Sequence, residues 1–203
     1  AELGWVPREW GVVRLDELGE IVTGNTPSTN NLDLYGDEYM FVSPADIGGD
    51  SVFIFSTEKN LSDLGMRASR VIPAGSVCTV CIGSTIGKMA VTTSICTTIQ
   101  QINTLIPNIK PFGSLYYYLM RHYLLPQLKV EAGLQAVPIV NKSRFSGLQI
   151  PIPNLDGECK LISKKLAGVD KAITAEVDVL GKMHLHKKGL MRDLLTGRVL
   201  VNG

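Results

Sequence analysis

Residues 157–196 contain no proline, and apolar side chains recur among them at alternating intervals of three and four. This spacing places side chains on one face of an α-helix. At ~1.5 Å per residue the stretch predicts a helix about 60 Å long, and Gly197 supplies its stop. The apolar positions on this stride are Cys159, Ile162, Leu166, Val169, Ile173, Leu180, Met183, Leu190 and Leu194, and two further positions, Glu176 and Lys187, are polar.

A helix with one apolar stripe is not stable alone in water, because its apolar face needs a partner along its length. The residues before it predict a domain only about 35–40 Å across, which a helix of about 60 Å would overshoot. We therefore predict that two chains pair through an antiparallel coiled coil; a helix folded back on its own domain is the alternative. The predicted dimer interface comprises Ile162, Leu166, Val169, Ile173, Leu180, Met183, Leu190 and Leu194.

The first part of the chain has a different texture, with short β-branched runs separated by Gly, Pro and Asn, which predict strands. These runs are GEIVTG (19–24), EYMFVSP (38–44), SVFIFS (51–56), GSVCTVCIG (75–83), KMAVTTS (88–94) and QQINTLIP (100–107). One helix is predicted over 114–129, and Pro126 should end or kink it. The fold class is therefore α+β, with a mixed β-rich domain over 1–152 and a spacer helix with a short tail over 153–203.

The net charge of +1 is distributed unevenly. From Gly157 onward there are nine Lys and Arg against five Asp and Glu, a charge of +4, whereas residues 1–156 carry 11 against 14, a charge of −3. The acidic balance of the larger part disfavours strong nonspecific DNA binding, so DNA affinity would come from a local patch or a basic partner. With no apolar run near ~18 residues and no secretion signal at the start, we expect a cytoplasmic protein without a membrane span.

Several weak motifs point to chemistry, and none is convincing. Gly83–Lys88 resembles a phosphate loop but has three residues between its glycines, and Met89 stands where Ser or Thr would hold magnesium. Cys78 and Cys81 have zinc-knuckle spacing without a second ligand pair, and burial as small core residues is the preferred interpretation. The remaining weak candidates are His184 with His186 as a metal pair and Glu158 with Lys160 as a nuclease motif. We therefore predict no catalytic residues, no metal and no cofactor.

Polar loops are the remaining candidates for function. Residues 24–31 are dense in amides and hydroxyls, the groups that pair with base edges and phosphates. Ordinary solvated turns are the alternative interpretation. The candidate DNA-binding residues are Asn25, Thr26, Ser28, Thr29, Asn30, Asn31, Ser43, Asp46, Lys59, Ser84, Thr85, Lys88, Gln100, Gln101, Gln135, Asn141, Lys142 and Arg144.

Five segments together resemble the specificity subunits of type I restriction–modification enzymes. They are LGWVPREWGVVRLDELGEIVTGNTPST (3–29), YMFVSPADI (39–47), IPAGSVCTVCIGSTIGK (72–88), LQIPIPNLDGECKLISKKLAGVDKAI (148–173) and KKGLMRDLLTGRVLV (187–201). They cover nearly the whole chain in the family's order. The chain departs from the family in carrying Glu158-Cys159 where the junction usually has Glu-Gln, and in having one recognition domain and one spacer helix instead of two of each.

The resemblance implies a non-catalytic subunit that reads one half of a bipartite site in double-stranded DNA. It also implies partners, namely a methyltransferase (modification) subunit and a restriction motor–nuclease subunit. A two-fold homodimer through the helix would place two such domains at opposite ends of an antiparallel pair. Two alternatives stay open: a coiled-coil adaptor without DNA readout, and a metal or nucleotide enzyme built on Cys78 and Cys81 or on Gly83–Lys88.

Overall fold

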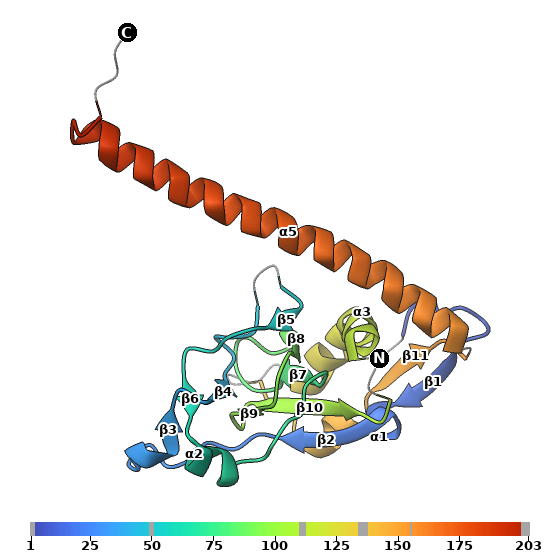
Figure 1. The fold of residues 1–203 in the computed structure, drawn as a ribbon. Helices are drawn as coiled ribbons and strands as arrows, with labels where there is room; N and C mark the ends of the chain where they lie inside the picture. Colours follow the sequence, from blue (N-terminus) through green and yellow to red (C-terminus); the bar gives the residue numbers. More distant parts are fainter. Residues whose placement is uncertain (1–2, 49–50, 110–112, 134–137, 155, 200–203) are drawn as a thin grey trace. The chain divides into compact units, whose positions relative to one another are not determined.

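The computed structural model describes residues 3–48, 51–109, 113–133, 138–154 and 156–199. Its contacts divide the chain into two compact units, Ala1–Lys165 and Leu166–Gly203. The first unit is a β-rich domain with short helices and one longer one, and the second is the greater part of a single long helix (Figure 1). The predicted α+β class is confirmed.

A five-stranded sheet forms the centre of the domain, in the order β2-β10-β7-β8-β5 (Figure 1). Its strands are β2 (Gly19–Thr23), β5 (Phe53–Ile54), β7 (Val77–Val80), β8 (Met89–Thr92) and β10 (Ile102–Pro107). All neighbours are antiparallel except β5 and β8, which are parallel. Each of these strands lies within one of the six β-branched runs that predict strands, so five of the six predictions are confirmed by this sheet.

Two smaller sheets complete the domain. The first has the order β3-β6-β4-β9, with β3 (Tyr35–Gly36), β6 (Asn60–Leu61), β4 (Tyr39–Val42) and β9 (Cys96–Thr98). The second pairs β1 (Gly11–Arg14) with β11 (Gln149–Ile152), antiparallel. Because β11 directly precedes the long helix, this pair ties the beginning of the domain to its end.

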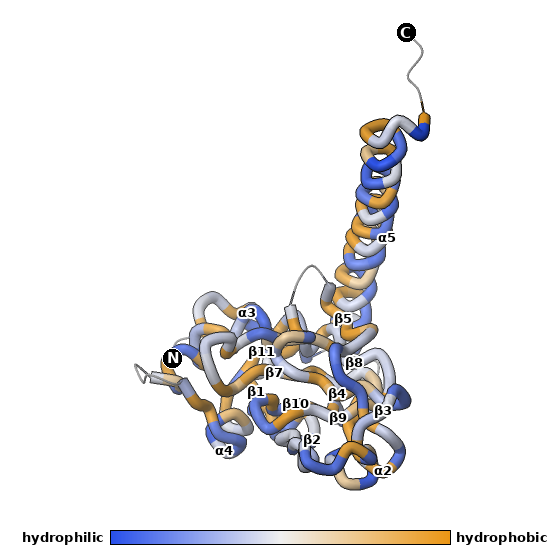
Figure 2. The backbone as a smooth tube through the Cα atoms, turned by 90° about the vertical axis from the view of Figure 1, so that its left-hand side faces the viewer, coloured by the Kyte–Doolittle hydropathy of each residue, from blue (hydrophilic) through white to orange (hydrophobic). Residues whose placement is uncertain are grey.

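Both faces of the central sheet are buried, as successive residues of β7 illustrate. Val77 belongs to the apolar cluster that contains residues of α3 (Gly113–Ala132). Cys78 and Val80 belong to the second cluster, together with Val42. Successive side chains of a strand point to opposite faces, so one short apolar run supplies both clusters. Figure 2 shows these strands as largely hydrophobic segments.

Helix α3 confirms the helix predicted over 114–129 and extends slightly past its predicted C-terminal end. The sequence predicts an end or a kink at Pro126, but the helix does not end there and continues to Ala132. Proline removes one helical hydrogen bond and crowds the preceding turn. Leu128 and Ala132, both beyond the proline, are buried in the core, and burial of their side chains compensates for that loss.

The remaining helices are short, except the last. They are α1 (Leu15–Leu18), the 3₁₀ turn η1 (Leu32–Leu34), α2 (Asp63–Arg67) and α4 (Lys142–Ser146). The last helix, α5, spans Asp156–Leu195 and confirms the long helix predicted over 157–196. Hydrophobic and hydrophilic residues alternate along it (Figure 2). Among the described residues, no helix is long and apolar enough to cross a membrane.

Candidate nucleic-acid interface

Three loops that carry predicted DNA-binding residues leave the central sheet at the same end. Residues 24–31 follow β2, residues 81–88 join β7 to β8, and residues 99–101 join β9 to β10. Strand β10 lies between β2 and β7 and runs antiparallel to both, so its start adjoins the ends of its two neighbours. We call this side of the domain the loop end.

The four-stranded sheet contributes to the same loop end. Its parallel strands β4 and β9 place Val42 beside Thr98, and the Ile99 amide donates to the Val42 carbonyl at 3.0 Å. The loop after β4 therefore starts next to the loop before β10. Lys59 lies opposite Phe41, whose amide donates to the Lys59 carbonyl at 3.1 Å. Two sheets thus present their loops side by side.

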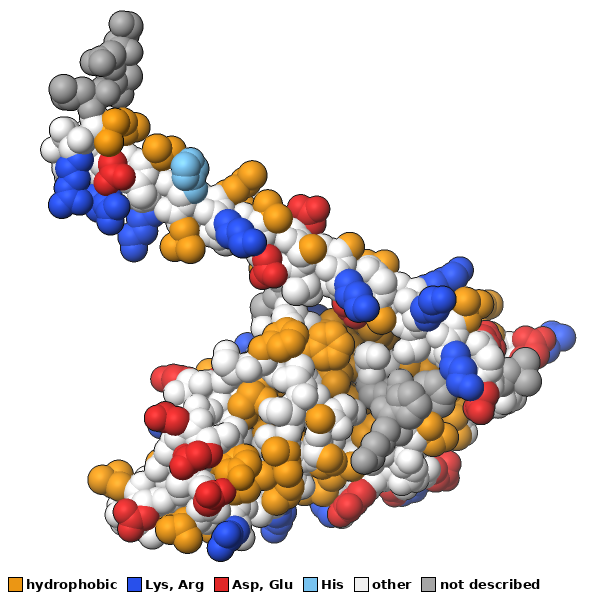
Figure 3. Space-filling view, in the orientation of Figure 1, with side chains coloured by type: hydrophobic (Ala, Val, Ile, Leu, Met, Phe, Trp, Pro, Cys, Tyr) orange, Lys and Arg blue, Asp and Glu red, His pale blue; other side chains and the backbone are white. Residues whose placement is uncertain are grey.

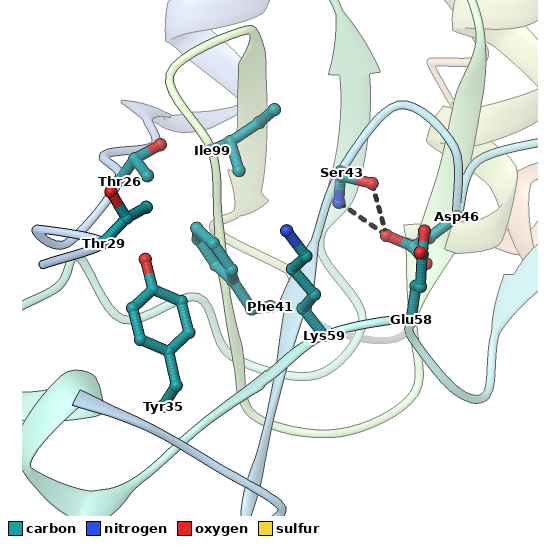
Figure 4. Close-up of a pocket in the computed structure, with 9 residues that line it drawn as sticks. All are labelled: Thr26, Thr29, Tyr35, Phe41, Ser43, Asp46, Glu58, Lys59 and Ile99. Carbon is teal, nitrogen blue, oxygen red and sulfur yellow. Dashed lines mark hydrogen bonds between the residues drawn. The ribbon is translucent and has the colours of Figure 1, made fainter. Parts of the chain in front are cut away.

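A pocket of about 310 Å³ opens where these loops meet. It is lined by Thr26, Thr29, Tyr35, Phe41, Ser43, Asp46, Glu58, Lys59 and Ile99. Five of these nine residues are candidates from the sequence. The Tyr35 and Phe41 rings pack edge to face with centroids 6.4 Å apart, and the Lys59 side chain extends between the Phe41 ring and the Ser43–Asp46 pair (Figure 4).

Asp46 shapes the wall of this pocket. One carboxylate oxygen accepts hydrogen bonds from the Ser43 amide at 2.8 Å and the Ser43 hydroxyl at 2.7 Å (Figure 4). The other accepts the Glu58 amide at 2.8 Å. A carboxylate that accepts several hydrogen bonds from its own loops holds them in place. Asp46 therefore braces the loop end, and its oxygens are largely engaged within the protein.

Three asparagines among the candidates also have structural roles. The Asn25 side chain donates to the Ala68 carbonyl at 3.2 Å and accepts the Arg70 amide at 2.8 Å. Asn31 caps η1, and Asn141 caps α4 by accepting the Arg144 amide at 2.9 Å. Amides that satisfy backbone groups at turns and helix starts are a common use of asparagine. These side chains therefore order the loops.

The turn between β7 and β8 holds a second group of candidates. Residues 83–88 form tight backbone turns, with the Ile86 amide donating to Gly83 and the Gly87 amide donating to Val80. Gly87 has φ +88°, and a Cβ there would lie 2.6 Å from Leu125, so glycine is required. The segment is thus a turn between two strands, with Lys88 at its rim. Ser84 is exposed, and Thr85 and Lys88 are partly exposed.

The segment before α4 runs alongside this turn. Ile139 bridges to Ile82, and the Val140 amide donates to the Cys81 carbonyl at 2.9 Å. Lys142 therefore begins a helix next to the loop end and is exposed. Arg144 lies 3.9 Å from a carboxylate oxygen of Glu131 and is partly neutralised by it. Gln135 falls outside the described residues.

Several candidate side chains are exposed and make no side-chain hydrogen bond or ion pair with any described residue. Four of them are Ser28, Thr29, Asn30 and Lys59. Thr26 and Gln100 instead bond to each other at 2.5 Å across the two loops. Unengaged hydroxyl, amide and ammonium groups can pair with base edges or phosphates without breaking internal bonds.

Two residues that contribute to the loop end, Tyr35 and Arg70, are not among the residues predicted from the sequence. Tyr35 supplies a ring to the pocket, and its hydroxyl donates to the Pro27 carbonyl at 3.0 Å. Arg70 donates to the Thr23 carbonyl at 2.7 Å and so supports the loop after β2 from a distant part of the chain. Neither residue lies in a recognisable motif. The local sequence around a tyrosine near a strand, or around an isolated arginine, does not predict these contacts.

Three residues of the weak catalytic and metal-binding motifs in the sequence are buried or make structural contacts. Cys78 and Cys81 are buried, as predicted, and burial raises the pKa of both thiols from 9.0 to about 12. A Glu158 carboxylate oxygen accepts the Trp10 indole N–H at 3.2 Å, which joins the start of α5 to the N-terminal segment. Among the described residues, no group of three or more His, Cys, Asp or Glu is arranged to hold a metal ion.

The predicted dimer interface is mostly exposed on α5, where hydrophobic and basic side chains stand side by side (Figure 3). The exposed fractions are 57% for Val169, 44% for Ile173, 55% for Leu180, 64% for Met183, 46% for Leu190 and 41% for Leu194. Ile162 differs, because it packs against the core of the domain. It is therefore not available as fully as the sequence predicts. Leu166 is intermediate.

Comparison with known proteins places this arrangement in a family. The family model described as the type I restriction modification DNA specificity domain matches residues 7–179. The HindI specificity subunit of Haemophilus influenzae is 33% identical over 202 residues, covering 96% of this chain and 42% of that protein. The MjaIX specificity subunit of Methanocaldococcus jannaschii is 24% identical, covering 79% of this chain and 38% of that protein. The chain thus spans less than half the length of these relatives.

Solved structures share the fold. The S subunit of the type I restriction–modification system of M. genitalium aligns with a TM-score of 0.65 at 14% identity, covering 91% of this chain and 45% of that one. The HsdS subunit of Thermoanaerobacter tengcongensis aligns with a TM-score of 0.55 at 23% identity, covering 85% and 40%. With a family model matched over most of its length and the same α+β fold, the chain belongs to the family of type I restriction–modification DNA specificity domains.

Proposed function

We propose that this chain is a sequence-specific DNA-recognition subunit of a type I restriction–modification complex. Its domain reads one half of a bipartite target in double-stranded DNA. Two copies pair through α5, and the homodimer directs a methyltransferase subunit and a restriction motor–nuclease subunit to the target. The observation that carries this proposal is the convergence of unengaged polar side chains at the loop end.

The chemistry of those side chains suits base reading. Hydroxyl and amide groups of Ser28, Thr29 and Asn30 can both donate and accept hydrogen bonds, as discrimination of base edges requires. Lys59 and Lys88 add cations that can fix the register on phosphates. The internal bonds of Asp46 support this role, because a braced loop loses less conformational entropy when it binds.

The charge balance supports participation in an assembly. Residues 1–156 carry a net charge of −3, which is unfavourable for a protein that holds DNA alone. A methyltransferase partner would contribute phosphate contacts, while the loop end contributes the choice of sequence. The relatives that match this chain are themselves named as specificity subunits of restriction enzymes.

We also propose that the chain is non-catalytic. Residues of the weak catalytic motifs have structural roles, and this supports the proposal. Cys78 and Cys81 are buried with raised pKa values, and Glu158 is hydrogen-bonded to Trp10. The Gly83–Lys88 segment is a tight turn in which Gly87 has a φ of +88°, a backbone conformation that favours glycine. Bond making would then belong to the partner subunits.

The test compares two sets of alanine substitutions in the complex with the methyltransferase subunit. Ser28, Thr29 and Asn30 are replaced together at the loop end. The matched control replaces Ser94 and Asn108, which are exposed at the opposite end of the central sheet. Duplexes that the wild-type complex enriches from a randomised pool, and scrambled versions of them, serve as probes.

We expect the loop-end variant to lose most of its preference for the enriched duplex, because one mismatched readout contact costs about 1–3 kcal/mol. Its unfolding transition should match that of the wild type. The control variant should keep the preference. An unchanged preference in the loop-end variant would show that target choice resides elsewhere.

A further inference from the structure

The exposed apolar seam of α5 has a defined start and end. Ile162 packs against the core of the domain and Leu166 is only partly exposed, so the fully exposed part of the seam begins at Val169 and ends at Leu194. Within this seam, eight residues follow the alternating spacing of three and four. They are Val169, Ile173, Glu176, Leu180, Met183, Lys187, Leu190 and Leu194, all of them exposed. Six are apolar and two carry opposite charges.

Neither charged residue has an opposite charge in reach on its own helix. Side chains three and four positions apart are neighbours on a helix surface. These neighbours are Ala172, Ile173, Val179 and Leu180 for Glu176, and Met183, His184, Leu190 and Met191 for Lys187. Neither Glu176 nor Lys187 takes part in an ion pair among the described residues. A single helix therefore leaves both charges within an apolar seam without a counterion.

A second copy of the chain removes this conflict in one arrangement. Under a two-fold axis perpendicular to an antiparallel pair, each residue faces a residue at the mirrored distance from the axis. The midpoint of Glu176 and Lys187 lies between Gly181 and Lys182, and the midpoint of Val169 and Leu194 is the same point. The facing pairs across the two chains are then Val169 with Leu194, Ile173 with Leu190, Glu176 with Lys187, and Leu180 with Met183.

We propose that α5 pairs with a second copy in this register, with the axis between Gly181 and Lys182 and two symmetry-related Glu176–Lys187 ion pairs inside the apolar seam. This proposal rests on the homodimer proposed above and specifies it. Six apolar positions of each chain meet apolar positions of the other. Each charge meets its opposite twice in the dimer, because a two-fold axis repeats every contact.

Other registers that keep the seam in contact leave charges opposed by apolar groups. A shift of one heptad in one direction places Glu176 opposite Leu180 and Lys187 opposite Val169. A shift in the other direction places Glu176 opposite Leu194 and Lys187 opposite Met183. A parallel pair in register would place like charges together. A desolvated charge without a partner is costly, so a polar pair within a seam selects one register and orientation.

Charge reversal in the 203-residue chain tests the register. In Glu176→Lys and in Lys187→Glu, both ion pairs of a homodimer become repulsive, and we expect its dissociation constant to rise about tenfold or more. Mixing the two variants restores both pairs, so the heterodimer should dominate over either homodimer in native mass spectrometry with one variant isotopically labelled. The double variant Glu176→Lys/Lys187→Glu should regain the wild-type dissociation constant.

Matched controls reverse the charge of exposed residues on the opposite face of α5. Asp178→Lys and Lys182→Glu change the net charge by the same amounts and should leave the dissociation constant close to that of the wild type. A second readout uses cysteines. The variant Leu180→Cys/Met183→Cys should form interchain disulfides rapidly, because these positions face each other in the proposed register. The variant Ile173→Cys/Met183→Cys should not form interchain disulfides rapidly, because these two positions would face each other only in a register shifted by one heptad.

The outcomes separate the register from the dimer. A wild-type chain that is monomeric by sedimentation at micromolar concentration contradicts the homodimer and, with it, the register. A wild-type dimer whose two charge-reversed variants remain homodimeric and exchange at random contradicts the register alone. A dominant heterodimer together with disulfides only in the Leu180→Cys/Met183→Cys variant supports it.

Discussion

At the scale of single residues, the polar side chains of the loop end fall into two groups. Some hydrogen-bond to the backbone of the loops, and others make no such bonds and are available to a ligand. Asp46 and Asn25 satisfy backbone amides of neighbouring segments. Thr29 and Lys59 face the same pocket without such bonds. The sequence predicts a DNA-binding role for both groups. An asparagine that caps a turn and an asparagine that contacts a base occur in loops of similar amino-acid composition. Only the pairing of segments distant in the chain distinguishes them.

Replacing Lys59 by alanine should weaken DNA binding by the assembled complex and change its salt dependence. Each phosphate contact contributes about 0.9 to the slope of log affinity against log salt concentration. The variant should therefore show a slope shallower by roughly that amount per half-site. Affinity measured by fluorescence anisotropy over a salt series checks this.

Arg14→Ala is the matched control for Lys59→Ala. It removes one positive charge beside α1, at the end of the central sheet away from the loop end, where Arg14 pairs with Asp16 at 2.6 Å. Its slope should equal that of the wild type. Equal slopes for Lys59→Ala and the wild type would exclude a phosphate contact by Lys59.

The buried thiols predict a pH dependence. The pKa values of Cys78 and Cys81 are about 12 in the folded state because burial disfavours the thiolate. Both groups hold their protons more tightly when folded, so their contribution to stability is complete below pH 9 and is lost progressively as the pH rises toward 12. At pH 8, iodoacetamide should label neither cysteine in the folded protein and both in urea. Rapid labelling of the folded protein at Cys78 or Cys81 would contradict their burial.

At the scale of elements, periodicity located the strands of the central sheet and α5 but not their partners. The β1–β11 pair joins Val13 to Ile150, far apart in the chain, and β4 lies parallel to β9. A β-branched run carries no information about which strand it meets. The extension of α3 from its predicted end at 129 to Ala132 was likewise not predictable, because it depends on burial of Ala132 in a core that the rest of the chain builds.

A buried glutamine joins α3 to β11. The Gln127 amide nitrogen donates to the carbonyls of Tyr123 and Gln149, each at 2.8 Å, and its oxygen accepts the Gln149 amide at 3.3 Å. Gln127→Leu should lower the free energy of unfolding by about 1–3 kcal/mol, because it leaves backbone groups of β11 without a partner. Urea denaturation measures this change.

Gln149→Ala provides the comparison for Gln127→Leu. Its exposed side chain makes no hydrogen bond among the described residues, while its backbone groups remain available to Gln127. The free energy of unfolding should change by less than about 0.5 kcal/mol. A similar loss in both variants would mean that Gln127 does not act through the β11 backbone.

At the scale of the whole molecule, a domain with a candidate DNA-reading surface is followed by a helix with an exposed apolar seam. In the proposed homodimer, each copy of the domain would read one half of a bipartite target. Because the two copies in this proposal are identical and related by a two-fold axis, their half-sites would be the same sequence in inverted orientation. A target of two different half-sites would require two different domains.

The most direct test is the methylation pattern of DNA in cells that contain only this chain and the methyltransferase subunit. Sequencing of modified bases should reveal a motif made of two inverted copies of one half-site, separated by a gap of fixed length. The motif should disappear when the chain is removed and should change when Ser28, Thr29 and Asn30 are replaced. An asymmetric motif, or one that is independent of this chain, would contradict the account.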